Sequence, residues 1–417
     1  MAETLTDKPS DDMKHEPLWQ NRDFLLLWSG QAVSVLGTSI SGIALPLLML
    51  ALTGSPAQAG LLVATGSLPY LVFGLPAGAL VDRWNRKTVM IACDLLRFVA
   101  AGSVPLAYVV GRLSVAQLFI VALVSGTAWV FFSIANTAAI LNVVPKEQLA
   151  QATGLGGSSA WGASVFGPGL GGFIINLARN TTIGATLAYL VDSFSYLASV
   201  LSLTLIRIRF QQERSPARST SIRADIVEGL SYLRQQNTVR ILAWLGLASS
   251  LFSSPTYLAI IVLARTDLHV DARTIGLIFS IASVAGLLGS FIASSVQARL
   301  RLGHIIVGAL IIQSLSMVLL ATSISPVTLV LGWGLISISL PIDGVAQITY
   351  RLSLIPDNFQ GRVGSLFQLL FIGGASLGTA AGGLLLTVVG PRIELAVVAL
   401  CTGALAATIS FTAVRRA

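Results

Sequence analysis

The sequence predicts an all-α membrane protein with twelve transmembrane helices in two pseudo-symmetric six-helix bundles. Three observations lead to this prediction: a low content of charged residues, twelve long apolar segments, and an internal repeat. Of the 417 residues, 54% are hydrophobic and only 11% are charged, whereas about 25% of residues are charged in a soluble domain. So few charges exclude a soluble enzyme, a disordered chain and a nucleic-acid-binding protein, despite the net charge of +8.

Twelve segments are long and apolar enough to cross a bilayer, which takes about 20 residues because the hydrocarbon layer is roughly 30 Å thick. They are residues 24–52, 59–81, 88–110, 115–141, 152–177, 183–206, 241–263, 274–297, 305–323, 327–350, 363–388 and 393–413. The predicted organisation is therefore a tail, a first bundle, a linker, a second bundle and a second tail, at residues 1–22, 23–206, 207–240, 241–413 and 414–417.

The distribution of lysine and arginine predicts the orientation. If the N-terminus is cytoplasmic, 20 of the 26 basic residues fall in cytoplasmic segments, five fall in outer loops, and Arg97 lies within a span. Basic residues concentrate on the cytoplasmic side of membrane proteins, so both termini are expected inside. The first 21 residues lack the basic start of a signal peptide, and the first apolar segment is expected to remain as a membrane anchor.

The linker between the bundles contains an approximate helical stripe of apolar residues from Ala224 to Arg240. Two interpretations fit this pattern equally well. The segment is either an amphipathic helix on the inner membrane surface or a linker helix packed on the protein.

An internal repeat relates the two halves at an offset of 211 residues. Pro145, at the end of the fourth span, corresponds to Pro356 at the end of the tenth. Four further pairs match at this offset: Asn136 with Gln347, Gly167 with Gly378, Gly171 with Gly382, and Gly172 with Gly383. These matches indicate duplication of a six-helix unit, and such repeats build transporters with a binding site near the membrane midplane.

The loop after the second span resembles a signature of the major facilitator superfamily, a glycine followed by Asp-Arg-x-Gly-Arg-Lys. The resemblance rests on five residues: Gly78, Asp82, Arg83, Arg86 and Lys87. It implies a gate loop in which Asp82 sits against the positive N-terminus of a neighbouring helix. Asn85 replaces the usual glycine and is expected in a left-handed turn, which Asn tolerates well. The alternative is a basic loop that only sets topology.

The fifth span resembles the helix signature of drug antiporters in this superfamily. The residues concerned are Gly154, Gly167, Pro168, Gly171 and Gly172. The small residues allow close helix packing, and Pro168 removes one backbone donor. Ordinary glycine-rich packing is the alternative.

Three further segments are similar to the macrolide-efflux and enterobactin-exporter group: residues 28–34, 144–152 and 191–197. This resemblance covers nearly the whole chain and implies a proton-coupled secondary exporter of lipophilic drugs or natural products. It implies alternating access by rocking of the two halves, a bacterial inner (plasma) membrane location, a monomer, and protons and membrane lipid as partners. A dedicated siderophore or antibiotic exporter is the alternative; a nutrient symporter or a non-transporting scaffold fits less well.

Ionisable residues inside the spans are costly and require an explanation. Asp343 is the main candidate for proton coupling, because a partly desolvated carboxylate on a cavity helix could bind and release a proton. Asp192 and Asp94 are the other candidates. Asp94 and Arg97 are three residues apart and are expected to form a local pair that braces the gate.

Candidate cavity residues follow from the resemblance, which assigns the first, fourth, seventh and tenth spans to the central cavity. Polar and aromatic side chains at helical spacing on these spans are suited to a bulky amphipathic ligand. They are Gln31, Ser34, Thr38, Trp129, Phe132, Asn136, Tyr257, Ser339 and Gln347.

Enzymatic and cofactor-dependent functions have no support in the sequence. The three histidines are isolated in the tail or in loops, so no metal site is expected. The phosphate-binding glycine loop with its lysine does not occur, so ATP is not expected to power the protein. The expected cofactor requirement is none.

Overall fold

The computed structural model describes residues 17–81, 83–208, 210 and 222–412, and all regular elements among these residues are helices. The predicted all-α fold is therefore confirmed for this part of the chain. Asp82, most of the two predicted tails and much of the linker lie outside the described residues.

Seven helices form the first half of the molecule. They are α1 (Arg22–Thr53), α2 (Pro56–Phe73), α3 (Pro76–Val81), α4 (Arg86–Val109), α5 (Val115–Val143), α6 (Leu149–Leu177) and α7 (Thr181–Leu205). Short polar residues precede most of them and accept a hydrogen bond from a backbone N–H of the first turn, which would otherwise lack a partner. These capping residues are Asn21, Ser55, Asn85, Ser114 and Asn180.

The second half begins with the linker helix. Its helices are α8 (Ile222–Gln235), α9 (Asn237–Ser253), α10 (Pro255–Thr266), α11 (Ala272–Arg299), α12 (Leu302–Ala321), α13 (Pro326–Leu354) and α14 (Asp357–Ser410). Within α14 the chain folds back at Gly390, whose φ of 78° and ψ of 170° are not helical. Consequently, α14 contains the last two predicted spans.

Every predicted span falls on one or two of these helices, but two spans are broken. The second divides into α2 and α3 before Pro76, and the seventh divides into α9 and α10 before Pro255. Proline has no backbone N–H to donate to the preceding turn, which explains a break at these positions. In the described part, nine helical stretches are long and apolar enough to cross a membrane by length and composition. The two remaining predicted spans are the broken α2–α3 pair and the glycine-rich α6.

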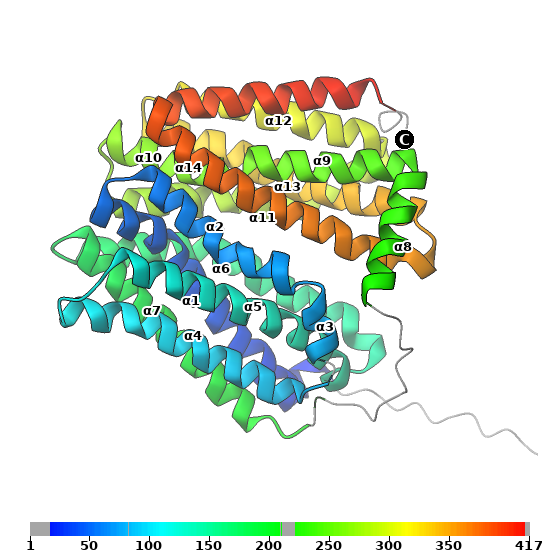
Figure 1. The fold of residues 1–417 in the computed structure, drawn as a ribbon, viewed down its shortest axis with the longest axis horizontal. Coiled ribbons are helices and arrows are strands. Elements are labelled where there is room, and N and C mark those ends of the chain that lie inside the picture. The colour runs from blue at the N-terminus through cyan, green and yellow to red at the C-terminus, as the bar shows by residue number, and fades with distance from the viewer. Residues whose placement is uncertain (1–16, 82, 209, 211–221, 413–417) are drawn as a thin grey trace, which may run out of the picture.

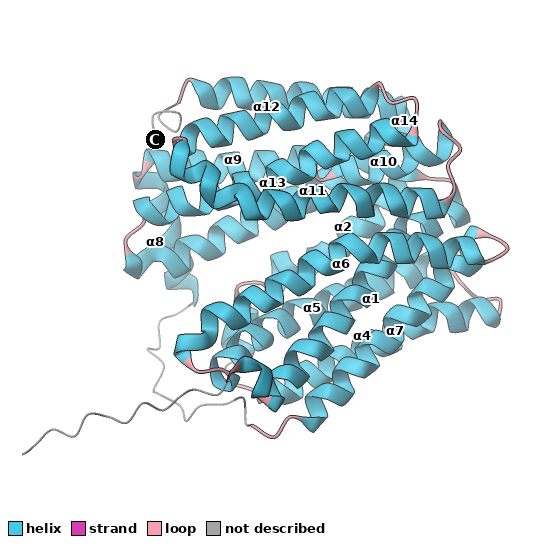
Figure 2. Ribbon diagram, turned by 180° about the vertical axis from the view of Figure 1, so that it is seen from behind, coloured by secondary structure: helices cyan, strands magenta, loops and turns pink. Residues whose placement is uncertain are grey.

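The two halves lie side by side, with α1–α7 in the lower part of Figure 1 and α9–α14 in the upper part. Figure 2 shows the same division from behind. The halves contact each other mainly through α2 with α14 and α6 with α11. Equivalent helices of the repeat therefore form the two contacts, as a two-fold relation between the halves requires.

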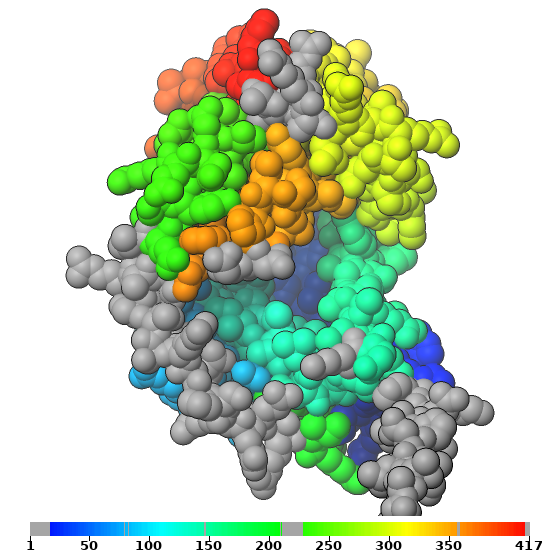
Figure 3. Space-filling model, turned by 90° about the vertical axis from the view of Figure 1, so that its right-hand side faces the viewer, coloured from blue at the N-terminus to red at the C-terminus, as the bar shows by residue number. Residues whose placement is uncertain are grey.

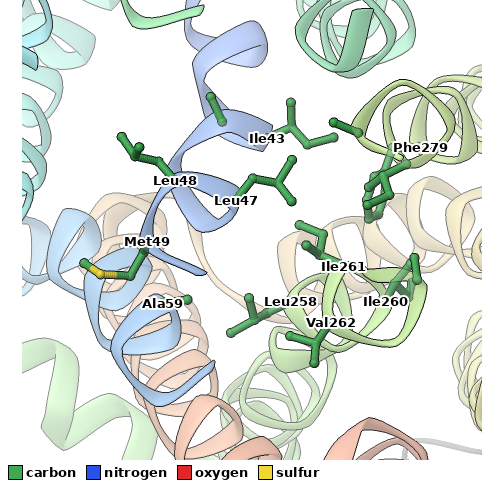
Figure 4. Close-up of a cluster of buried hydrophobic side chains, with 14 of the residues drawn as sticks. Ile43, Leu47, Leu48, Met49, Ala59, Leu258, Ile260, Ile261, Val262 and Phe279 are labelled. Atoms are coloured by element: carbon green, nitrogen blue, oxygen red, sulfur yellow. The ribbon is translucent and has the colours of Figure 1, made fainter. Parts of the chain in front are cut away.

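The halves are closed together at the end opposite α8, which we call the far end. Figure 4 shows this closure: Ile43 and Leu47 of α1 face Leu258 and Ile261 of α10, and Phe279 of α11 completes the cluster. All five side chains are buried. Burial of apolar surface from both halves closes the far end. The Arg265 guanidinium of α10 also donates to the Thr181 hydroxyl of the first half at 2.7 Å.

The opposite end, which carries α8, is open. The space-filling view from this end shows a hollow between the two halves, with part of α1 visible at its base (Figure 3). The molecule is therefore wedge-shaped, joined at the far end and separated at the α8 end.

The linker helix α8 packs on the second half. The Tyr232 ring stacks on Phe359 with centroids 4.8 Å apart, and its hydroxyl donates to the Leu354 carbonyl at 3.2 Å. Glu228 forms an ion pair with Arg362 at 2.9 Å. Of the two interpretations from sequence, these contacts favour a linker helix packed on the protein.

The fold-back at Gly390 generates a stability prediction. We expect Gly390→Ala to destabilise the protein by about 1–3 kcal/mol, because only glycine readily adopts this backbone conformation. A Cβ at Gly390 would meet no atom within 4 Å, so the effect would be conformational and not steric. The measurement is thermal unfolding of the purified protein in detergent.

Gly308→Ala is the matched control. Gly308 lies inside α12 and also has open space around its Cβ position, so alanine should be neutral or slightly stabilising there. Equal unfolding temperatures for the two variants would contradict the account.

Candidate functional site

Two cavities in the first half bring together most of the predicted cavity residues. The first cavity, about 390 Å³, is enclosed by α1, α4, α5 and α6. Six of the nine predicted residues line it: Gln31, Ser34, Thr38, Trp129, Phe132 and Asn136. The polar stripe of α1 and the aromatic face of α5 thus line the same cavity.

The second cavity, about 430 Å³, lies deeper among α1, α2, α4, α5 and α7, and α14 of the other half contributes Phe371. Its walls are mainly apolar and aromatic, and include Tyr70 and Tyr189. Thr38, Arg97 and Trp129 line both cavities, so these side chains mark the place where the two cavities meet.

A buried polar cluster occupies this meeting place. The Arg97 guanidinium donates to the Thr38 hydroxyl at 3.3 Å and lies over the Tyr196 ring, 4.1 Å from its centroid. Asp94 lies 3.8 Å from Arg97. The Tyr196 and Thr38 hydroxyls are 2.9 Å apart.

Asp192 completes the cluster from α7. Its carboxylate accepts a hydrogen bond from Ser41 at 2.6 Å and a longer one from Tyr196 at 3.4 Å. We call these six residues, from α1, α4 and α7, the Arg97 cluster: Thr38, Ser41, Asp94, Arg97, Asp192 and Tyr196. It combines one cation with two carboxylates, of which Asp192 lines a cavity and Asp94 is fully buried.

Arg97 and Asp94 are therefore positioned differently from the expected gate brace. The sequence predicted a local pair near the gate loop, and the structure places Arg97 in the walls of both cavities. Asp94 lies behind it, fully buried, with no hydrogen-bond partner among the described residues. Asp192 also lines the second cavity.

The three remaining predicted cavity residues and the proton-coupling candidate Asp343 lie in the second half, apart from these two cavities. The Asp343 carboxylate accepts a hydrogen bond from Gln347 at 2.9 Å, while its other oxygen is buried without a partner among the described residues. Ser339 donates to its own helix, at the Ile336 carbonyl. Tyr257 packs on the Phe279 ring, with centroids 4.3 Å apart, in the far-end core.

The basic residues of the gate loop bind the end of α7. Lys87 donates to the Ile206 carbonyl at 2.7 Å and to the Thr204 carbonyl at 3.3 Å. Arg86 reaches the Phe210 carbonyl at 3.4 Å. The last carbonyls of a helix lack intrahelical partners and carry partial negative charge, so cations are stabilising there. Arg83 is exposed, and a Cβ at Gly78 would meet no atom within 4 Å.

The expected left-handed turn at Asn85 is wrong. Asn85 has φ −70° and ψ 113°, an extended conformation, and caps α4 by accepting a hydrogen bond from the Thr88 N–H. The side chain of Asn supplies a helix cap that glycine cannot provide, which accounts for the difference.

The glycine signature of α6 faces two different helices. Gly167 and Gly171 lie against α1, and Gly172 lies against Gly276 of α11 in the other half. Pro168 is buried, and its carbonyl borders Gly276. Gly154 has open space around its Cβ position. The signature thus serves both packing within the first half and contact between halves.

A second glycine contact joins the halves at Gly60 of α2 and Gly383 of α14, where a Cβ on Gly60 would lie 2.8 Å from the Gly383 Cα. We call this pair, together with Gly172 and Gly276, the far junction. Side chains at these four positions would separate the halves, because the backbones approach too closely to leave room.

Two buried acidic residues were not predicted from sequence. Asp23 accepts hydrogen bonds from the backbone N–H groups of Arg207 and Ile208. Its position in the first helical turn after Asn21 could have marked it in the sequence as a residue that binds backbone N–H groups. Glu394 is fully buried in α14. Because it is the second residue of the predicted twelfth span, the sequence suggested a position at the membrane surface and not in the protein core.

Solved structures show which known fold this architecture shares. A point mutant of the nucleoside transporter NupG superposes with a TM-score of 0.77 at 11% identity, covering 94% of this chain and 100% of the mutant chain. A bacterial homologue of the lysosomal transporter Spinster, in an inward-facing conformation, gives 0.75 at 16% identity, covering 95% and 97%. The fold is that of a major facilitator transporter.

Sequence comparison identifies the family. The transmembrane secretion effector family matches residues 14–416, and the chain belongs to this family of transporters. Macrolide efflux protein A of Streptococcus pyogenes is 28% identical over 224 residues, 54% of each chain. The multidrug efflux pump Tap of Mycolicibacterium fortuitum is 27% identical over 263 residues, 61% of this chain and 62% of Tap. These alignments span less than two thirds of each relative.

These comparisons confirm the predicted superfamily and its similarity to macrolide-efflux proteins. They also confirm that the protein belongs among transporters and not among enzymes.

The far junction generates a second stability prediction. We expect Gly172→Ala to lower the unfolding temperature, because the added Cβ would clash with the Ala272 carbonyl oxygen and lie 3.0 Å from the Gly276 Cα. Gly156→Ala, in the same helix with open space around it, should have no such effect. If Gly172→Ala unfolds at the temperature of Gly156→Ala, the two halves do not meet as closely as described.

Proposed function

We propose that the protein is a proton-coupled secondary active exporter of lipophilic drugs or natural products that works by rocking of its two halves. The observation that carries this proposal is the Arg97 cluster at the meeting place of two aromatic-lined cavities. Each cavity is within the range of small-molecule sites, about 300–1,000 Å³. The named efflux activities of related proteins support the same class of substrate.

The walls of the second cavity suit an amphipathic substrate. Tyr70, Trp129 and Phe371 offer apolar ring surface, while Asp192 and Arg97 offer charge at one side. Binding of a bulky apolar body with one polar contact fits a ligand that partitions into membranes.

In the proposed mechanism the cavities open alternately to the two sides of the membrane, and the hollow at the α8 end represents one of these two states. We propose that this end faces the cytoplasm, that both termini lie there, and that the protein resides as a monomer in the bacterial inner membrane in contact with lipid. The asymmetry of basic residues supports this orientation. The wedge shape in Figures 1 and 3 then represents an inward-open state.

Asp192 is the proposed principal proton carrier, with Asp94 and Asp343 as the other candidates. Asp192 combines cavity lining with hydrogen bonds from Ser41 and Tyr196, so a proton or a substrate can compete for the same carboxylate. Moving one proton through 100 mV supplies about 2.3 kcal/mol, enough to support more than a tenfold substrate gradient.

The proposal predicts that Asp192→Asn abolishes uphill efflux driven by a pH gradient. Asparagine keeps the size and hydrogen-bonding capacity of the side chain but cannot titrate. Substrate exchange without a gradient should persist, because exchange needs no net proton transfer. Both fluxes are measured in proteoliposomes with a radiolabelled macrolide as the probe.

Asp267→Asn is the matched control, because Asp267 pairs with the half-buried Arg392 at the far end, away from both cavities. It should pump normally. Undiminished concentrative efflux by Asp192→Asn would remove Asp192 from the mechanism and direct the same test to Asp343→Asn and Asp94→Asn. Absence of macrolide flux with purified wild-type protein, alongside flux of another single compound, would favour a dedicated exporter.

Orientation is tested separately by cysteine labelling in intact cells. We expect a cysteine at Gln235, at the exposed end of α8, to resist a membrane-impermeant maleimide, and a cysteine at Ile324 between α12 and α13 to react. Ile324 is 81% exposed, so access alone decides its reactivity. The reverse pattern would overturn the proposed topology.

A further inference from the structure

Glu394 is a buried carboxylate that the proposed mechanism does not use. It lies on α14 just after the fold-back at Gly390. Its side chain is 0% exposed, and neither carboxylate oxygen has a hydrogen-bond partner among the described residues. An ionised carboxylate in such a place would lack both water and a counter-charge.

Glu394 lies directly behind the far junction. A Cβ on Gly382 would be 3.4 Å from the Glu394 Oε1 and would clash with the Pro255 ring. The next residue, Gly383, makes the contact with Gly60 of the other half. The carboxylate is therefore packed beside the segment of α14 that joins the two halves.

Among the described side chains of the neighbouring helices, no charged group contacts Glu394. Arg392, two residues away, is bound to Asp267 at 2.9 Å and to the Ala321 carbonyl at 3.1 Å. On α10, Arg265 donates to the Thr181 hydroxyl and the Val270 carbonyl, and Tyr257 packs among aromatic rings.

The other helices packed on α14 carry their titratable groups elsewhere. The only ones on α9 and α12 are Arg240 and His304, both in the first turns at the α8 end, and the described side chains of α8 itself lie at that end. On α2 the only one is Tyr70, which lines the second cavity.

The repeat indicates that the fold does not require a carboxylate at this position. At the offset of 211 residues, Glu394 corresponds to Ile183 near the start of α7. An apolar side chain serves in the equivalent place of the first half, so Glu394 needs an explanation other than packing.

We propose that Glu394 is a proton-binding site that controls closure of the far junction. With the junction closed, the buried side chain holds a proton and is neutral. Separation of α14 from α2 admits water to the region of Gly382 and Gly383, where the ionised form becomes hydrated and the proton is released. The proton-bound form therefore favours a closed far end and an open α8 end.

The sign of the pH effect follows from this linkage. Lower pH populates the neutral form and closes the far end, and higher pH opens it. One linked proton changes the ratio of the two states by at most about tenfold per pH unit. This effect needs no substrate, so its test is independent of the proposed export activity.

The experiment measures the distance across the far end by double electron–electron resonance in lipid nanodiscs, without substrate, from pH 5 to pH 9. Spin labels are attached at Arg112→Cys, in the exposed loop after α4, and at Ile324→Cys, after α12, with Cys93 and Cys401 replaced by alanine. We expect the long-distance population of the otherwise wild-type protein to grow with pH. In Glu394→Gln, which is permanently neutral, it should stay small and change less than about twofold over this range.

Glu394→Met provides a second neutral variant of similar length in case glutamine destabilises the protein, and it should behave in the same way. Glu228→Gln, on α8 and remote from the far junction, serves as the control that retains Glu394, and its far-end distances should still respond to pH. The proposal is overturned if the neutral Glu394 variants keep the pH response, or if the protein with Glu394 intact shows none. Loss of export with an intact pH response would instead count against the proposed function alone.

Discussion

The absence of water from the bilayer core is the constraint on which the arrangement around Arg97 depends. A guanidinium inside the membrane must be satisfied by the protein. The Thr38 hydroxyl, the Tyr196 ring and the Asp94 carboxylate surround the guanidinium from three different helices, while its Nε has no hydrogen-bond partner among the described residues. Asp192 joins the same cluster through Tyr196. Hydroxyl groups of α1 and α7 therefore bind the buried charges of Arg97 and Asp192, and this charged cluster borders both cavities.

The wedge shape follows from a difference between the two ends of the molecule. At the far end, four glycines allow the backbones of α2 and α14, and of α6 and α11, to approach closely, and apolar side chains of α1 and α10 fill the space between. These contacts lie at one end only, so the halves can separate at the other. Helix contacts that depend largely on van der Waals packing can be replaced by other helix contacts when the halves move, as alternating access requires.

The sequence was sufficient to predict the spans and the repeat. The thickness of the bilayer fixes the length of an apolar segment, and duplication leaves matching residues at a constant separation along the chain. It was less informative wherever the direction of a side chain mattered. Tyr257 and Ser339 lie on helices that the resemblance assigned to the central cavity, yet Tyr257 packs in the far-end core and Ser339 bonds to its own helix. The spacing of Asp94 and Arg97 predicted their pairing, but only the packing of α1 and α7 against α4 shows that Arg97 borders the cavities. Glu394 was missed because it is the second residue of the predicted twelfth span, where a charged side chain is expected to lie at the membrane surface and not in the protein core.

The central claim is that proton and substrate compete at the Arg97 cluster, and the most direct measurement is the number of protons released when substrate binds. Purified protein in weakly buffered detergent solution is titrated with a macrolide while the pH is recorded, and binding is followed in parallel by calorimetry. The account predicts release of about one proton per bound substrate for the wild type, and release close to zero for Asp192→Asn at retained binding. Equal proton release by the two proteins at equal occupancy would contradict it.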